Sequence, residues 1–354
     1  MIPVPFIEYI NVRIKGFHSH LFTRDTYEDL LSGDSLVAVT TYLLNNPRYG
    51  GDIERALGGR REREGLEHGV TDYFARVISD LLDMASGTTF ETFRIVMYSF
   101  DLKNIRSVVL GHSKGLPFQE VKNMIVPCGS LRRSDCATLL AVPDITGMIP
   151  LLSRRLPFAA ETLAMTLREA GDRDKTADLL NRFEVNFYSR LMQRLYTDSE
   201  DMSVIRNVYS VEIDMKNVLS VLKFIWERRD RDWDIERDFA HGGKISLSFL
   251  NDMLRCPSLD EAFEMLEKTP FHTAVEKGII YYAETGFLHE MERFFEEIFI
   301  RKTQMYRRCS PFGIGVFISY VWAQFIELTN LRTIINGIAF RAGPGQIRKG
   351  LVYV

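Results

Sequence analysis

Apolar residues recur at steps of three and four along most of this 354-residue chain. The stretches FEVNFYSRLMQRLY and FLHEMERFFEEIFI are typical, and the Leu, Met, Glu and Arg that fill them favour helices. Strict alternation of apolar and polar residues, which marks half-buried strands, is scarce, and β-like runs such as VVL lie inside blocks with the helical period. The pattern therefore predicts an all-α fold.

One helical block occurs three times. It reads DLKNIRSVVL from Asp101, DMKNVLSVLK from Asp214 and ELTNLRTIIN from Glu327. The asparagines at its fourth position are Asn104, Asn217 and Asn330, and the interval from the first to the second equals the interval from the second to the third. Equal spacing without gaps indicates an internal repeat.

Further landmarks keep the same order in each copy. Upstream of each block come a short helix, a polar break, a second helix and then a proline near an aromatic residue, at Pro47, Pro157 and Pro270. Glycines close the first two copies, at Gly129 and at 242–243, where we expect left-handed backbone. The sequence thus predicts three repeats, residues 1–129, 130–243 and 244–354, each longer than a solenoid repeat and each a small helical bundle.

On a helix, the second, fifth, eighth and ninth positions of the block form one apolar stripe. We therefore expect all three block helices to pack by the same face. The stripe residues are Leu102, Ile105, Val108, Val109; Met215, Val218, Val221, Leu222; and Leu328, Leu331, Ile334, Ile335.

The acid that opens each block projects from this packed face, beside the asparagine three positions on. Because a buried unpaired charge is costly, each acid needs a partner: the asparagine, an arginine such as Arg76 or Arg190, or a helix terminus. An acid/base site present three times is the alternative, but duplication preserves packing, whereas three identical active sites would be unusual. The residues predicted to have this structural role are Asp101, Asn104, Asp214, Asn217, Glu327 and Asn330.

Composition narrows the possible partners and location. A net charge of −3 provides no basic field for a nucleic acid. The four cysteines are widely spaced, and the opening MIPVPFIEYI lacks the features of a secretory signal, so we expect a cytoplasmic protein. The stretch from Cys309 to Ile326 carries no charge, but proline, glycine and polar residues interrupt it, so a buried helix is favoured over a membrane span.

The residues that could form a metal-binding or catalytic site do not have the spacing that such sites require. The run RRDRDWDIERD from Arg228 resembles a calcium loop, but Ile235 stands where glycine is needed and His241 where glutamate is needed. His18 and His20 face different directions on a helix, and the other histidines are isolated. Standard nucleotide, hydrolase and metalloprotease motifs do not occur in the sequence. We expect neither a catalytic residue nor a cofactor, metal or small-molecule substrate.

The three blocks, the SPFG before the last one and the ending NLRTIINGIAFRAGPGQIRKGLVYV together resemble the C subunit of archaeal and bacterial V/A-type ATPases, a relative of the d subunit of eukaryotic V-ATPases. The most specific part is the core Glu327, Asn330, Leu331, Arg332 with the closing Ile347–Arg348. Leu219 departs from the arginine of the other two blocks.

This resemblance implies a non-catalytic funnel, or collar, of three helical domains around a pseudo-three-fold axis. It also implies a position on the cytoplasmic face of the membrane, peripheral and in one copy per complex. The partners would be the proteolipid rotor ring and the D and F subunits of the axle, and torque would be transmitted for ATP-coupled transport of H⁺ or Na⁺. Two alternatives stay open: a generic helical scaffold outside a rotary ATPase, and an all-α enzyme with an unfamiliar site.

Overall fold

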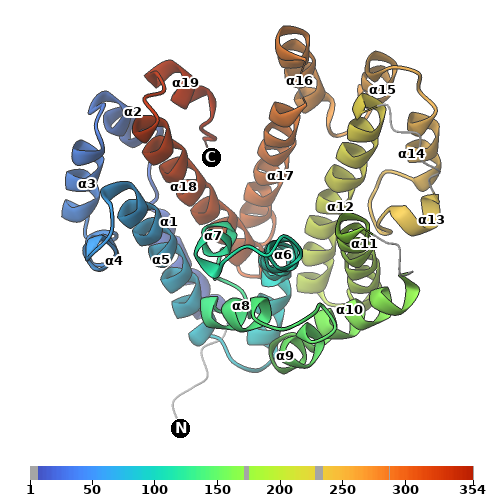
Figure 1. The fold of residues 1–354 in the computed structure, drawn as a ribbon, viewed down its shortest axis with the longest axis horizontal. Coiled ribbons are helices and arrows are strands. Elements are labelled where there is room, and N and C mark those ends of the chain that lie inside the picture. The colour runs from blue at the N-terminus through green and yellow to red at the C-terminus, as the bar shows by residue number, and fades with distance from the viewer. Residues whose placement is uncertain (1–6, 171–174, 228–233, 287, 354) are drawn as a thin grey trace. The chain divides into compact units, whose positions relative to one another are not determined.

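The computed structural model describes residues 7–170, 175–227, 234–286 and 288–353. Every regular element in these ranges is a helix, and they contain no strand (Figure 1). The prediction of an all-α fold is confirmed. Contacts divide the chain into two compact units, of which unit 1 combines Met1–Met97 with Thr303–Val354 and unit 2 is Tyr98–Lys302.

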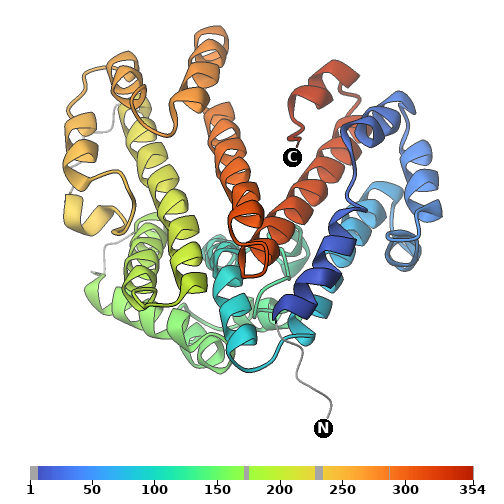
Figure 2. The same cartoon turned by 180° about the vertical axis from the view of Figure 1, so that it is seen from behind.

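Unit 1 joins both ends of the chain. Its helices are α1 (Ile7–His18), α2 (Arg24–Ser32), α3 (Leu36–Asn45), α4 (Gly50–Leu57), α5 (Glu62–Asp83), the start of α6 (Gly87–Ser113), the end of α17 (His289–Cys309), α18 (Gly315–Ala339) and α19 (Pro344–Lys349). Helix α18 packs against α1, α3 and α5, and Figure 2 shows α1 (dark blue) lying along α18 (red).

Unit 2 contains the rest of α6 and most of α17. Between them lie α7 (Phe118–Val121), the 3₁₀ turn η1 (Lys122–Met124), α8 (Arg133–Leu140), α9 (Met148–Arg155), α10 (Pro157–Glu169), α11 (Thr176–Arg194), α12 (Glu200–Glu227), α13 (Ile235–Asp238), α14 (Leu247–Leu254), α15 (Leu259–Leu266) and α16 (His272–Thr285). Both borders of unit 2 therefore fall inside helices, and the division into three repeats stays a prediction.

Local sequence explains where several helices begin. Thr23, Ser35, Ser246 and Ser258 each precede a helix, and each side-chain oxygen accepts a hydrogen bond from a backbone amide of the first turn. Proline occupies the first turn of α10 and α19, where its missing amide hydrogen costs nothing. The GPGQ sequence contains the start of α19, with Gly343 at the N-cap and Pro344 as the first helical residue.

The repeated block lies on the long helices α6, α12 and α18. Of its predicted stripe residues, all are buried except Met215, which is half-buried. From Gly315 on, the uncharged stretch before the third block forms the buried start of α18, where Ser319 Oγ donates to Gln304 Oε1 at 2.6 Å. The residues before Gly315 lie at the end of α17 and in a partly exposed turn. A buried helix was predicted for this stretch, and this is confirmed from Gly315 on. Within the described residues, no helix combines the length and apolar character needed to cross a membrane.

Candidate functional site

Each block asparagine binds the backbone amide and carbonyl of one residue, which lies 22 or 23 positions further along the chain. Asn104 Nδ2 donates to the Val126 carbonyl at 2.8 Å, and Asn104 Oδ1 accepts from the Val126 amide at 2.8 Å. The same two bonds join the other pairs, Asn217 with Ala240 and Asn330 with Val352. All three asparagines are buried, so each amide side chain replaces the water that this backbone amide and carbonyl would otherwise bind.

The two aspartates bind the backbone just before a helix. The Asp101 carboxylate accepts from the amides of Ser130 and Leu131, each at 3.0 Å, directly before α8. Asp214 accepts in the same way from residues 244 and 245, at 3.0 and 2.9 Å, directly before α14. Of the three kinds of partner considered from the sequence, the one that binds both aspartates is therefore a helix terminus. Burial raises the pKa of Asp214, although the two amides oppose this shift.

The arginines that were considered as partners lie elsewhere. Arg76 bonds Asp52 at 2.8 Å, and Arg190 bonds Glu161 at 3.2 Å. Neither sequence position nor charge alone could assign these pairs.

Glycine is required for two different physical reasons at the ends of the first two predicted repeats. A Cβ atom at Gly129 or Gly243 would lie closer than 3 Å to the carboxylate of Asp101 or Asp214. Left-handed backbone was predicted here, and this is right for Gly242, whose φ is +105°, but wrong for Gly129 and Gly243. At those two positions glycine is needed because the acid approaches the backbone closely.

The third acid, Glu327, has a different set of partners. It accepts from the backbone amide of Phe22 at 2.5 Å, just before α2, from the Tyr49 hydroxyl at 2.6 Å and from Arg48 Nη2 at 2.7 Å. His20 stands two positions before Phe22, whereas glycine stands two positions before Leu131 and Ile245 in the segments that the two aspartates bind. The longer side chain of glutamate thus binds one amide and two side chains, whereas each aspartate binds two amides.

Arg48 is enclosed by aromatic rings as well as by the acid. Its guanidinium lies 5.6 Å from the Phe22 ring centroid, 5.4 Å from that of Tyr49 and 5.2 Å from that of Tyr73. Burial acts to lower the pKa of Arg48, but Glu327 and the tyrosines raise it overall. Burial and the Glu327 charge hold the pKa of Tyr49 well above its usual value. Arg48 therefore stays charged, and Tyr49 stays a neutral donor.

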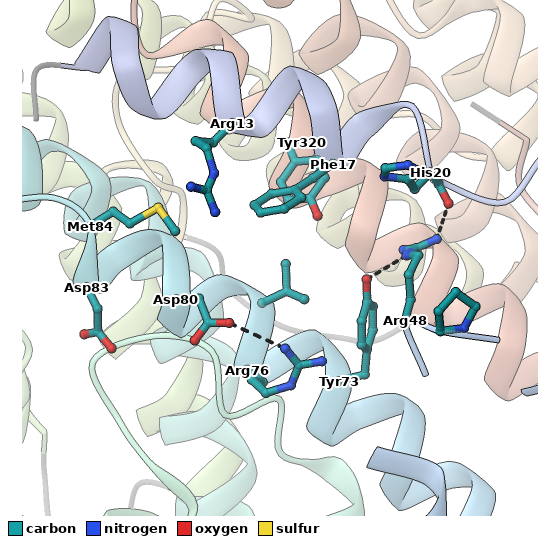
Figure 3. Close-up of a pocket in the computed structure, with 12 residues that line it drawn as sticks. Arg13, Phe17, His20, Arg48, Tyr73, Arg76, Asp80, Asp83, Met84 and Tyr320 are labelled. Carbon is teal, nitrogen blue, oxygen red and sulfur yellow. Dashed lines mark hydrogen bonds and ion pairs between the residues drawn. The ribbon is translucent and has the colours of Figure 1, made fainter. Parts of the chain in front are cut away.

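A cavity of about 570 Å³ opens beside Arg48 within unit 1 (Figure 3). Arg13 and Phe17 reach it from α1, and Arg76 and Asp80 from α5. Arg76 bonds both Asp52 and Asp80, and Arg48 bonds Glu327. These pairs join α5 to α4 and the segment between α3 and α4 to α18, so charged side chains beside the cavity hold helices of unit 1 together.

Unit 2 holds two buried glutamates that sequence reasoning missed. Glu184 forms ion pairs with Arg106 and Lys216 beside a second cavity of about 570 Å³. Glu212 accepts from Ser99 Oγ at 2.8 Å and from the Tyr188 hydroxyl at 3.1 Å. Burial raises the pKa of Glu212. Neither acid stands out in the sequence, because each lies in an ordinary helical run.

The described residues contain no cluster of side chains that could bind a metal ion. No three His, Cys, Asp or Glu side chains among those residues are grouped closely enough to hold an ion. Residues 228–233 of the calcium-like run lie outside the described residues. The Asp234 side chain caps α13 by accepting from the Arg237 amide.

Comparison with known proteins gives one consistent family. A family model described as ATP synthase (C/AC39) subunit matches residues 10–350. The A-type ATP synthase C subunit from Methanocaldococcus jannaschii is 20% identical over 97% of this chain and 86% of its own length. The C subunits from Haloferax volcanii and Thermoplasma acidophilum are 23% and 22% identical, over 98% and 96% of this chain and 97% and 96% of their own lengths.

Proposed function

This chain belongs to the ATP synthase (C/AC39) subunit family, and from that premise we propose that it is the central-stalk C subunit of a rotary ATPase. It links an axle made of the D and F subunits to the proteolipid ring and sits peripherally on the cytoplasmic face of the membrane. One copy serves each complex. Its work is to transmit torque, so that ATP hydrolysis drives H⁺ or Na⁺ transport or ion flow drives ATP synthesis.

The observation that carries this proposal is the repeated asparagine contact. Asn104, Asn217 and Asn330 make the same pair of backbone bonds at equal intervals along the chain. Equal contacts at equal intervals support three helical domains of one design. A chain built from equivalent domains can meet a round partner through several similar surfaces.

The contacts of the acids support a role without chemistry of its own. Asp101 and Asp214 each bind two backbone amides next to a helix start, and Glu327 binds one. Their carboxylates are therefore engaged in holding segments of the fold together. In this proposal nucleotide is bound and hydrolysed by other parts of the complex.

Purification of the tagged chain from detergent-solubilised membranes tests the proposal. We expect the proteolipid ring, the axle and the ATPase head to be recovered with it. Recovery of the folded chain with other proteins, and without the ring and the axle, would contradict the rotor assignment and favour a scaffold outside a rotary ATPase.

A further inference from the structure

Helix α3 carries no charge although it lies at the outside of unit 1. Its ten residues read LVAVTTYLLN, without an acid or a base. One side of α3 packs against α4, α5 and α18, and both views show no other described helix of unit 1 on the opposite side (Figures 1 and 2). A helix that is apolar on all sides is normally buried. The composition of α3 is therefore that of a helix covered on both sides.

The exposed side chains of α3 form one stripe. Val37 is 65% exposed and Leu44 is 39% exposed, and Thr41, between them in sequence, is exposed as well. Steps of four and three residues place these side chains on the same face of the helix. The Thr41 hydroxyl donates to the Val37 carbonyl at 2.8 Å, so the polar side chain of the stripe already has a partner within the helix. The stripe thus presents apolar surface over two helical turns.

Negative charge gathers where α3 begins. Asp34 lies in the turn that joins α2 to α3, and Asp29 lies near the end of α2. Both are exposed, and neither forms an ion pair with a described residue. The cations of this region are engaged elsewhere, since Arg348 bonds another acid of α2 at 2.7 Å and Arg24 lies 5.3 Å from the Tyr353 ring centroid. The two aspartates are therefore uncompensated beside the apolar stripe.

The backbone of Asp34 makes its side chain notable. Its φ of +43° lies in the left-handed region, which glycine adopts at lower cost than any residue with a side chain. The turn itself would thus be formed more easily by glycine. What the aspartate adds is a carboxylate at the end of the stripe, in a conformation that costs stability.

We propose that α3 is the docking surface for a helix of a partner protein, whose apolar side chains cover Val37 and Leu44 and whose Lys or Arg side chains face Asp29 and Asp34. A stripe at steps of four and three residues is the surface by which one helix packs against another. Opposite charges at one end of the contact would fix the direction of the partner helix and favour its encounter. The stripe spans about 10 Å, so two to three turns of the partner are enough.

Photo-crosslinking of the full chain in the cells where it is native tests this surface. The photoreactive residue p-benzoylphenylalanine replaces Val37, and as a matched control it replaces Val12 of α1, which is 68% exposed. After irradiation the tagged chain is purified and the captured peptides are sequenced. At position 37 we expect a peptide of another protein, with apolar residues at steps of three and four and with Lys or Arg at one end. The control should not capture this peptide.

A charge variant separates docking from folding. Asp29→Asn combined with Asp34→Gly removes both charges and relieves the left-handed backbone, so we expect a melting temperature no lower than that of wild type. The yield of the crosslink at position 37 should fall about fivefold, because two exposed ion pairs are lost. An unchanged yield in this folded variant would overturn the proposal. No crosslink at position 37, or capture there of an acidic peptide, of this chain's own residues or of the peptide that position 12 captures, would overturn it as well.

Discussion

The backbone amide of Phe22 donates a hydrogen bond of 2.5 Å to the carboxylate of Glu327, which lies 305 residues further along the chain. In the first two blocks, the acid binds amides only 29 to 31 residues downstream. The third acid instead joins the segment before α2 to α18, within unit 1. Of the three block acids, Glu327 is thus the one whose bond to a backbone amide joins segments that are far apart in sequence.

Glu327→Ala should destabilise the protein more than Asp101→Ala does. Removing the acid leaves Arg48, whose side chain is 17% exposed, without its carboxylate, and breaking a buried pair in this way costs about 3 kcal/mol or more. Glu327→Gln keeps a side chain that can accept hydrogen bonds and should cost less than Glu327→Ala. Urea unfolding gives the free energy of unfolding of each variant and so ranks them. Equal losses of this free energy in Glu327→Ala and Asp101→Ala would show that the pair with Arg48 is unimportant.

Asp214→Ala should lower thermal stability, since it leaves the amides of Lys244 and Ile245 without their acceptor. The expected loss is about 1–3 kcal/mol, measured by urea or thermal unfolding. Asp198→Ala, at an exposed aspartate, is the matched control and should stay within about 0.5 kcal/mol of wild type. Unchanged stability of Asp214→Ala combined with lost function would indicate that the acid is a functional site.

Gly243→Ala should be destabilising because the added methyl group would collide with the Asp214 carboxylate. Gly345→Ala is the control, since no atom lies within 4 Å of a Cβ placed there. Removing the acid removes the collision, so the double variant Asp214→Ala with Gly243→Ala should be less damaged than the sum of the two single losses. Additive losses in this double-mutant cycle would show that the glycine serves some other purpose.

Glu212→Gln should change how stability depends on pH. Because burial raises the folded-state pKa of Glu212, the folded protein binds this proton more strongly than the unfolded chain does. Its contribution to stability is therefore lost as pH rises from the unfolded value near 4.5 through the folded value. The glutamine variant should gain stability relative to wild type as pH rises, in urea unfolding series across that range. A difference that does not vary with pH would contradict the assigned cause.

The helices and the repeated block could be predicted because both leave local, periodic signals. Leu102, Val218 and Leu331 follow the helical period, and their burial follows from it. The backbone partners of the acids could not be predicted, because nearly every residue has a backbone amide and the sequence does not indicate which one binds an acid. A usable clue was present in the glycines, since Gly129 follows Asp101 at nearly the same interval as Gly243 follows Asp214.

Two features of the third site could not be found in this way. His20 replaces the glycine, and Glu327 replaces the aspartate, so the spacing rule of the first two blocks does not apply to it. Arg48 comes from the segment between α3 and α4, and only the folded chain brings it to α18. Tertiary placement, rather than local pattern, decides both contacts.

Rotation of the chain itself is the most direct test of its assignment to the rotor. A bead attached through a cysteine at exposed position Lys268 would be observed during ATP hydrolysis, with the ATPase head of the purified complex fixed to a surface. If the chain belongs to the rotor, the bead turns in one direction, together with the axle. A bead that stays still while a marker on the axle turns would place this chain outside the rotor.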